Sequence, residues 1–241
     1  MLTQLQILLF CTAITPIFGI FGGKTAELGQ FPHVASLRLN NFHFCSGSII
    51  SEKFILTSAY CKSRGSIELI TAVVGTIHQV NGGDHYNIVK YLNHENWTQA
   101  SLLNDIAIVE VKTPIRFNKF VQPIRLPTKL FDDKGIATVS GFGTVSYPNV
   151  PSKYLMWVDQ RILGLERCRI ANAPVIVYDS QICSHPDAGQ GICEGDIGGA
   201  LVMDGTLIGI ASKSTYYCGS GLHDFYTNVY FYLDWVTNNS N

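Results

Sequence analysis

The chain has 241 residues, of which 46% are hydrophobic and 15% are charged, and its formal net charge is −1. This composition is typical of a globular protein with a sizeable core and argues against a disordered chain. The sequence has no basic run and no acidic tail. It therefore gives no electrostatic footprint for nucleic acid or for an anionic membrane surface, and we expect neither as a partner.

Residues 1–19 have the pattern of a secretory signal peptide. Their apolar core, Ile7–Ile14, is too short to span a bilayer, and no later stretch approaches the about 20 apolar residues of a membrane span. We expect cleavage after Gly19 or, earlier, after Ala13. The sequence therefore predicts a secreted, extracellular protein.

The rest of the chain predicts an all-β protein. Short apolar runs rich in β-branched and aromatic residues alternate with turn residues such as Asn81–Asp84. In chain order, the predicted strands are Val34–Leu39, Ser48–Leu56, Thr71–Val74, Ile106–Val111, Ala137–Gly141, Leu207–Ala211 and Phe225–Val229. The clearest helical segment is Tyr230–Thr237, in which Tyr232, Trp235 and Val236 recur at helical spacing and give one apolar face.

The cysteines fit a secreted product. Cys11 lies in the signal segment, which leaves six of the seven cysteines in the remainder. These are Cys45, Cys61, Cys168, Cys183, Cys193 and Cys218. Their spacing alone does not choose among the many possible pairings. A zinc site is disfavoured because the sequence has no Cys-x-x-Cys or His-x-x-x-His pair, and we expect no metal and no cofactor.

Three segments carry a resemblance to a known family. Residues 193–199 are Cys-Glu-Gly-Asp-Ile-Gly-Gly, residues 56–61 are Leu-Thr-Ser-Ala-Tyr-Cys, and residues 104–109 are Asn-Asp-Ile-Ala-Ile-Val. They resemble the active-site segments of chymotrypsin-like serine proteases, above all those of arthropod chymotrypsins. Further matching segments in the expected order are Ile20–Gly23, Gln30–Pro32, Cys45–Ile50, Val121–Pro127 and Ser140–Gly143. The resemblance extends over residues 20–236.

The resemblance implies a fold of two six-stranded antiparallel β-barrels with a cleft between them and a C-terminal helix. Residues 20–241 would form one monomeric domain whose chain crosses from one barrel to the other near residues 114–133. It also implies the disulfides Cys45–Cys61, Cys168–Cys183 and Cys193–Cys218, each worth about 3 kcal/mol in the chain-entropy model.

The catalytic positions implied by the resemblance have lost their chemistry. Tyr60 stands at the position of the general base and Ile197 at that of the nucleophile, and only Asp105 is retained. An alkyl side chain forms no covalent intermediate, and a phenol with a pKa of about 10 is a poor base at neutral pH. We expect Thr57 and Ser58 not to replace the nucleophile, and Asp105 to serve the fold as a hydrogen-bonded carboxylate.

Other positions around the site also differ from the residues that the family has there, which indicates that the site has changed as a whole. None of the seven histidines stands in a matching segment, so we expect them to be exposed or hydrogen-bonded. Ala200 stands where the family has a proline after the nucleophile loop, and Lys213 where it has a tryptophan that walls the substrate groove. We therefore expect no peptidase activity.

Some binding apparatus is retained. The resemblance implies that the backbone N–H groups of Gly195 and Ile197 still point into an oxyanion hole. The implied pocket residues are Gly191, Ile192, Ser212, Lys213, Ser214 and Asp224. Lys213 would place a charge on an apolar wall and Ser214 would narrow the mouth, whereas Asp224 would attract a basic side chain or be neutralised by Lys213. A functioning peptide groove and a partly occluded remnant both stay open, and we favour the remnant.

Activation in the family depends on an ion pair between a freed Ile amino group and the aspartate before the nucleophile, here Ile20 and Asp196. Residues 1–19 contain no Lys or Arg, which excludes tryptic activation. Cleavage after Gly19 would expose Ile20 directly. Cleavage after Ala13 would leave Asp196 without its partner, and we expect the carboxylate then to turn toward solvent.

Two sequons, at Asn96 and Asn238, predict N-glycosylation.

The favoured hypothesis is a secreted, non-catalytic serine protease homologue that binds another protein or peptide, as a decoy, cofactor or regulator of proteolysis or host defence. One alternative is an enzyme that uses Tyr60 and Asp105 in an unusual hydrolytic role. Another is a weakly active or non-functional paralogue of a digestive or venom chymotrypsin-like endopeptidase.

Overall fold

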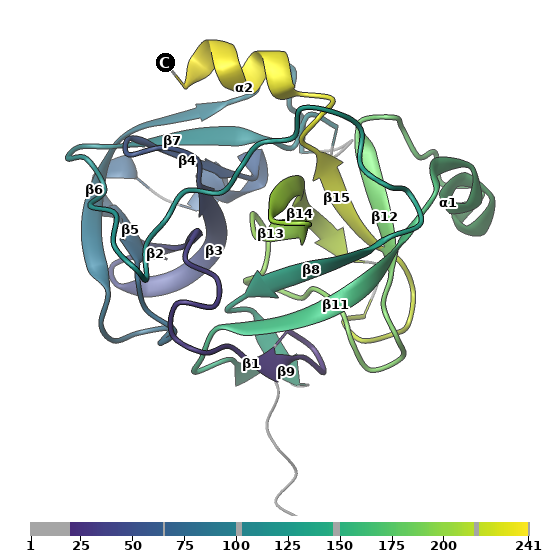
Figure 1. The fold of residues 1–241 in the computed structure, drawn as a ribbon, viewed down its shortest axis with the longest axis horizontal. Helices are drawn as coiled ribbons and strands as arrows, with labels where there is room; N and C mark the ends of the chain where they lie inside the picture. Colours follow the sequence, from purple (N-terminus) through teal and green to yellow (C-terminus); the bar gives the residue numbers. More distant parts are fainter. Residues whose placement is uncertain (1–19, 65, 100–102, 147–149, 215–216, 241) are drawn as a thin grey trace, which may run out of the picture.

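The computed structural model describes residues 20–64, 66–99, 103–146, 150–214 and 217–240, which form two barrels side by side with a helix above them (Figure 1). The predicted signal segment 1–19 lies outside these residues. The elements are β1 (Lys24–Thr25), β2 (Val34–Leu39), β3 (Phe42–Ile49), β4 (Phe54–Thr57), the 3-10 helices η1 (Ala59–Arg64) and η2 (Ile67–Leu69), β5 (Ile70–Val74), β6 (Asp84–Asn93), β7 (Ala107–Val111), β8 (Ile136–Gly141), β9 (Thr144–Ser146), β10 (Val150–Pro151), β11 (Met156–Leu163), α1 (Leu165–Asn172), β12 (Gln181–His185), β13 (Ala200–Met203), β14 (Thr206–Ser214), β15 (Asp224–Asn228) and α2 (Leu233–Asn239).

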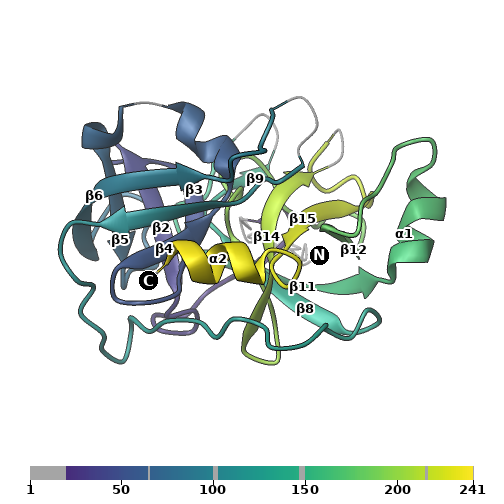
Figure 2. The ribbon, with the colours of Figure 1, turned by 90° about the horizontal axis from the view of Figure 1, so that it is seen from above.

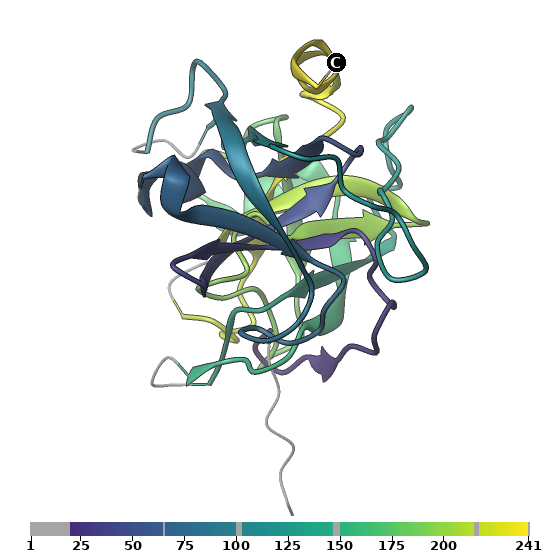
Figure 3. The same cartoon turned by 90° about the vertical axis from the view of Figure 1, so that its left-hand side faces the viewer.

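The first barrel closes through the strand order β2-β3-β4-β7-β6-β5, and its outer surface faces the viewer in Figure 3. Alternate apolar side chains of these strands point inward, as a half-buried sheet requires. Leu37, Ile49, Ile55 and Val109 are among the buried residues of its core. Strand closure leaves this barrel without an open sheet edge.

The second barrel has the strand order β11-β12-β15-β14-β13-β8 and closes where β8 pairs with β11. Met156 lies opposite Gly141, and Leu201 lies opposite Val139. The short strand β1 extends this sheet beyond β11. The chain passes from β7 to β8, and so from one barrel to the other, over residues 112–135. The expected fold of two six-stranded antiparallel barrels is confirmed.

A third apolar cluster joins the two barrels beneath α2, which lies across their junction in Figure 2. Leu56 and Ile108 come from the first barrel, Leu207 and Ile210 from the second, and Val236 from α2. Burial of such side chains stabilises the contact by about 1.5–3 kcal/mol each. Across the described residues, no helix combines the length and the apolar character needed to cross a membrane.

The six cysteines of the described residues pair as the resemblance implies. The bonds are Cys45–Cys61, Cys168–Cys183 and Cys193–Cys218. The first ties β3 to the η1 turn, and the second ties α1 to β12.

The predicted single strand Ser48–Leu56 is wrong. The chain makes a hairpin there: β3 ends at Ile49 and β4 begins at Phe54. The turn forms because the Ser51 hydroxyl accepts hydrogen bonds from the N–H groups of Lys53, at 3.3 Å, and Phe54, at 3.2 Å. The flanking run is apolar on both sides of this turn, so its composition resembles one long strand.

The predicted helix at Tyr230–Thr237 exists but begins later, at Leu233, and ends at Asn239. The structure also has elements that the sequence pattern did not predict: β1, β6, β9, β10, β11, β12, β13, α1 and the 3-10 helices η1 and η2. In β6, exposed polar residues interrupt the apolar positions Tyr86, Ile88 and Tyr91, which alone face the core.

Close contact between the barrels predicts an unequal response to two glycine substitutions. Gly198 has φ +85°, and an added Cβ would lie 2.1 Å from the Ser46 carbonyl oxygen of β3. Gly198→Ala should therefore destabilise the fold by about 1–3 kcal/mol beyond the cost of its backbone conformation, measured by urea unfolding. Gly189→Ala is the matched control, since Gly189 has φ +84° with nothing within 4 Å of the added Cβ. Equal losses in the two variants would contradict the crowding argument.

Candidate active site

The structure brings the three catalytic positions of the resemblance to the junction of the barrels. Tyr60 lies in η1, directly after β4, and Asp105 precedes β7. Ile197 lies in the loop between β12 and β13 of the second barrel. Its carbonyl accepts a hydrogen bond of 2.8 Å from the N–H of Ser46 in β3, which fixes this loop against the first barrel.

The Ile197 side chain is partly buried and packs against the apolar core of the first barrel. It has no proton to give and no lone pair to attack a carbonyl. Its contribution at this position is van der Waals contact across the junction of the barrels.

Asp105 is fully buried, and its carboxylate is enclosed by hydrogen-bond donors. One oxygen accepts from the Ser58 hydroxyl at 2.6 Å and from the N–H of Tyr60 at 2.9 Å. The other accepts from the Ser212 hydroxyl at 2.6 Å. Burial raises the pKa of Asp105 above its ordinary value, and these hydrogen bonds oppose that shift.

Sequence reasoning missed the role of Ser58. It set the residue aside as a nucleophile but did not predict that its hydroxyl binds Asp105. The available signal was its position, because Ser58 stands where the resembling segment has alanine, one residue before Ala59. The Thr57 hydroxyl is also committed, since it donates to the Ser46 carbonyl at 2.7 Å.

The conformation of the loop at Gly195 requires glycine at this position, and a hydrogen bond to a histidine holds the loop in place. Gly195 has φ +95°, and an added Cβ would lie 2.9 Å from the Cα of Gly143. Its carbonyl lies 2.9 Å from Nε2 of His43, a partly buried residue on β3. Loss of hydration lowers the pKa of His43 to about 4, so its ring is neutral at physiological pH.

The expectation that the histidines are exposed or hydrogen-bonded holds for His43 but not for His33. His43 has partners at both ring nitrogens, Ser36 and Gly195. His33 is buried, and within the described part of the chain its Nε2 has no hydrogen-bond partner. The expectation is therefore wrong for His33, whose pKa burial lowers to about 4.

The pocket floor holds a buried carboxylate. Asp224 accepts hydrogen bonds of 2.8 Å from the amide side chain of Gln160 and from the N–H of Ile192. An added Cβ at Gly191 would lie 2.9 Å from its Oδ2, so the carboxylate occupies the space beside that glycine. Burial raises the pKa of Asp224 to about 7. Gln160, which sequence reasoning missed, also accepts from the Tyr226 hydroxyl at 2.7 Å.

The remaining pocket positions lie on β14. The Ser212 hydroxyl donates its hydrogen bond to Asp105. Lys213 is exposed, and among the described residues no ion pair joins it to Asp224, so the expected neutralisation of that acid is not present. The side chain of Ser214 lies outside what the structure describes. The two sequon residues, Asn96 and Asn238, are both exposed.

Asp196 is fully buried in the chain that includes the residues before Ile20. Its two oxygens accept from the N–H groups of Gly143, at 2.7 Å, and Cys193, at 2.9 Å. These two donors replace part of its hydration. That Asp196 turns toward solvent after cleavage at Ala13 stays a prediction. Burial raises its pKa to about 7, and the charge of nearby Asp224 adds to the rise. Its ion pair with the amino group of Ile20 stays a prediction.

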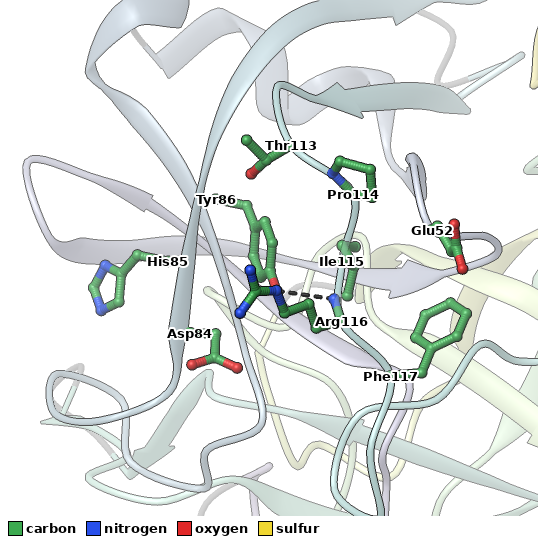
Figure 4. Close-up of a pocket in the computed structure, with 9 residues that line it drawn as sticks. All are labelled: Glu52, Asp84, His85, Tyr86, Thr113, Pro114, Ile115, Arg116 and Phe117. Atoms are coloured by element: carbon green, nitrogen blue, oxygen red, sulfur yellow. Dashed lines mark hydrogen bonds between the residues drawn. The ribbon is translucent and has the colours of Figure 1, made fainter.

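A separate cavity of about 760 Å³ lies at the surface of the first barrel, and none of its lining residues is one of the predicted site residues. Figure 4 shows Glu52 and Asp84 on opposite sides of the Tyr86 ring. The Tyr86 hydroxyl accepts a hydrogen bond of 3.0 Å from the N–H of Arg116. Over the described ranges, no group of three or more His, Cys, Asp or Glu side chains could hold a metal ion.

Comparisons with known proteins agree with this geometry. The family model described as "Trypsin" matches residues 20–236. The chain belongs to the trypsin family. It is 34% identical to Chymotrypsin-2 of Vespa crabro, over 91% of this chain and 99% of that protein. It is 30% identical to Trypsin delta of Drosophila melanogaster, over 92% of this chain and 88% of that protein.

Among solved structures, the fold of this trypsin-family chain is similar to that of neuropsin, a serine protease expressed in the limbic system of mouse brain. The TM-score is 0.83 at 23% sequence identity, and the match covers 91% of this chain and 99% of neuropsin.

The buried Asp196 predicts a pH-dependent stability. Its pKa of about 7 exceeds the ordinary 3.8, so between these values the folded chain binds more protons than the unfolded chain. The free energy of unfolding should therefore fall as the pH rises through this window. Asp196→Asn should reduce the dependence of the thermal midpoint between about pH 4 and about pH 7 without removing it, because Asp224 has a similarly raised pKa, and the exposed control Asp187→Asn should leave it unchanged. An Asp196→Asn variant with the wild-type slope would contradict the assignment.

Proposed function

We propose that this trypsin-family protein is secreted, has no peptidase activity, and acts by binding another protein or a peptide. The observation that carries the proposal is the alkyl side chain of Ile197 at the nucleophile position. In this role the protein would serve as a decoy, a cofactor or a regulator of proteolysis or host defence.

The surroundings of Ile197 support the loss of chemistry. Covalent catalysis needs a hydroxyl and a base that takes its proton. The hydroxyls of Ser58 and Ser212 donate to Asp105, and Tyr60 offers a phenol in place of an imidazole. When the triad of a serine protease is removed, the oxyanion hole and substrate binding alone still accelerate the reaction about 10³–10⁴-fold over water. Because uncatalysed amide hydrolysis is extremely slow, this remainder supplies no useful turnover.

The retained framework supports a binding role. The loop that carries Gly195 and Ile197 is fixed by hydrogen bonds to β3, and Cys193–Cys218 closes the chain behind it. The buried carboxylates Asp105 and Asp196 have donors on both oxygens. A scaffold held in this way keeps a defined binding surface although it lacks a nucleophile and a general base. The similarity to proteins named chymotrypsin and trypsin also favours the alternative, a paralogue of an endopeptidase with weak activity or none.

The first test is restoration of activity. We expect the secreted wild-type protein to cleave none of a panel of peptide substrates. If the groove still accepts a peptide, Tyr60→His with Ile197→Ser should raise kcat/KM at least about 10³-fold above the detection limit, since a complete triad is worth about 10⁶ in kcat. The matched control is Tyr60→Phe with Ile197→Val, which keeps the size of both side chains without supplying a nucleophile or a base.

The outcomes separate the hypotheses. Cleavage by the purified wild type would overturn the non-catalytic proposal, and its loss in the control pair would assign the chemistry to the Tyr60 hydroxyl. Turnover by the restored variant alone would support peptide binding in the cleft. If both proteins are inert, the groove is occluded, and the binding surface is to be sought elsewhere on the barrels.

A further inference from the structure

The cavity of about 760 Å³ on the first barrel is built from three separate segments of the chain. Glu52 comes from the turn between β3 and β4, Tyr86 from the first half of β6, and residues 113–117 from the segment that follows β7. The N–H of Ile115 donates to the Glu52 carbonyl at 2.7 Å, and the N–H of Arg116 donates to the Tyr86 hydroxyl at 3.0 Å. These bonds fix the segments to one another, so the cavity is preformed and little ordering is needed to fill it.

Aromatic and aliphatic side chains form part of the cavity wall. Ile115 is 2% exposed and Tyr86 is 7% exposed, whereas Phe117 is 37% exposed and so stands nearer to solvent. In the view of Figure 4, Phe117 lies on the same side as Glu52. A wall of this kind suits the methylene chain of a long basic side chain, which packs on apolar surface while its charged end stays in water.

The Tyr86 hydroxyl has an unused donor. Its oxygen accepts from the N–H of Arg116, but within the part of the chain that the structure describes its own proton has no acceptor. A buried hydroxyl normally finds a partner for its proton as well as for its lone pairs. A molecule in the cavity that carries an acceptor, such as a carboxylate, would satisfy this proton.

Charged groups of both signs line the cavity, and among the described residues they do not pair with one another. The guanidinium of Arg116 and the carboxylates of Glu52 and Asp84 make no hydrogen bond or ion pair there. The Arg116 side chain lies between the two acids in the view of Figure 4. Arg116 and the Tyr86 hydroxyl thus offer donors to an anion, whereas the two acids offer acceptors to a cation.

We propose that this cavity binds the C-terminal lysine or arginine of a peptide. Arg116 and the Tyr86 hydroxyl would hold the terminal carboxylate. Glu52 and Asp84 would attract the basic end of the side chain, and its methylene chain would pack on Phe117. A basic residue inside a peptide would leave Arg116 and the Tyr86 proton without an anion, and an acidic residue would be repelled by the two carboxylates. The site lies outside the junction of the barrels, so it is independent of whether the chain has peptidase activity.

The test is titration of the secreted protein with four small probes, followed by NMR of its amide groups. Nα-acetyl-lysine carries both charged groups, its amide lacks the carboxylate, and Nα,Nε-diacetyl-lysine lacks the cation. Free lysine adds an ammonium beside the carboxylate, which Arg116 would repel. For a ligand of this size we expect a Kd of about 1 mM for Nα-acetyl-lysine, and at least about threefold weaker binding of the other three probes. The shifts should be largest at residues 84–86 and 113–117.

Two variants assign the charges. Arg116→Met should abolish the preference for the carboxylate over the amide, and Glu52→Gln with Asp84→Asn should abolish the preference for the free ammonium over its acetylated form. Glu27→Gln with Asp187→Asn is the matched control, because it removes the same charge from exposed acids outside the cavity and should change neither preference. The residues exchanged in the cavity are also exposed, so we expect the thermal midpoint of the wild type in each variant.

The comparison among the probes uses only the wild type, so it stands even where a variant fails to fold. Equal affinity for the four probes, shifts centred on another surface, or no saturation below about 20 mM would overturn the proposal. Variants that keep both preferences of the wild type would overturn it as well. Tighter binding of free lysine than of Nα-acetyl-lysine would assign the cavity to free amino acids and so contradict a peptide terminus as its ligand.

Discussion

The contact between the Ile197 loop and strand β3 is the constraint on which the rest of the site depends. The Ser46 N–H binds the Ile197 carbonyl at 2.8 Å, and His43 binds the Gly195 carbonyl at 2.9 Å. Gly198 approaches the same strand so closely that a Cβ does not fit. Because these bonds use backbone groups of the loop, the junction of the barrels keeps its geometry whatever side chain stands at position 197.

The buried acids of the site are held by donors other than the side chains of residues 60 and 197. Asp105 retains three donors, from Ser58, Tyr60 and Ser212, without any histidine. An unpaired buried carboxylate would cost several kcal/mol, so these donors protect the fold. Asp224 is compensated in the same way at the pocket floor, by Gln160 and a backbone N–H. We infer that the polar interior of the site now serves stability.

The family resemblance carried by short motifs implied the barrels, the cysteine pairs and the place of the catalytic positions, whereas the spacing of the cysteines alone left their pairing open. It did not predict the partners that depend on packing between distant segments, such as Ser58 with Asp105 or His43 with Gly195. The hairpin within 48–56 was missed because the short polar segment that forms its turn, residues 51–53, lies between two apolar runs that together resemble one strand. The two backbone donors to Asp196, from Gly143 and Cys193, were not predicted because one of them comes from a separate loop.

The most direct test of the central claim, that the junction of the barrels carries no activated nucleophile, is mass spectrometry of the wild-type protein after exposure to a serine-directed fluorophosphonate. We predict no added mass under conditions in which an active trypsin-family protease is labelled completely. A single covalent adduct on the folded protein, lost on denaturation before labelling and mapped to a hydroxyl at the junction of the barrels, would contradict the account.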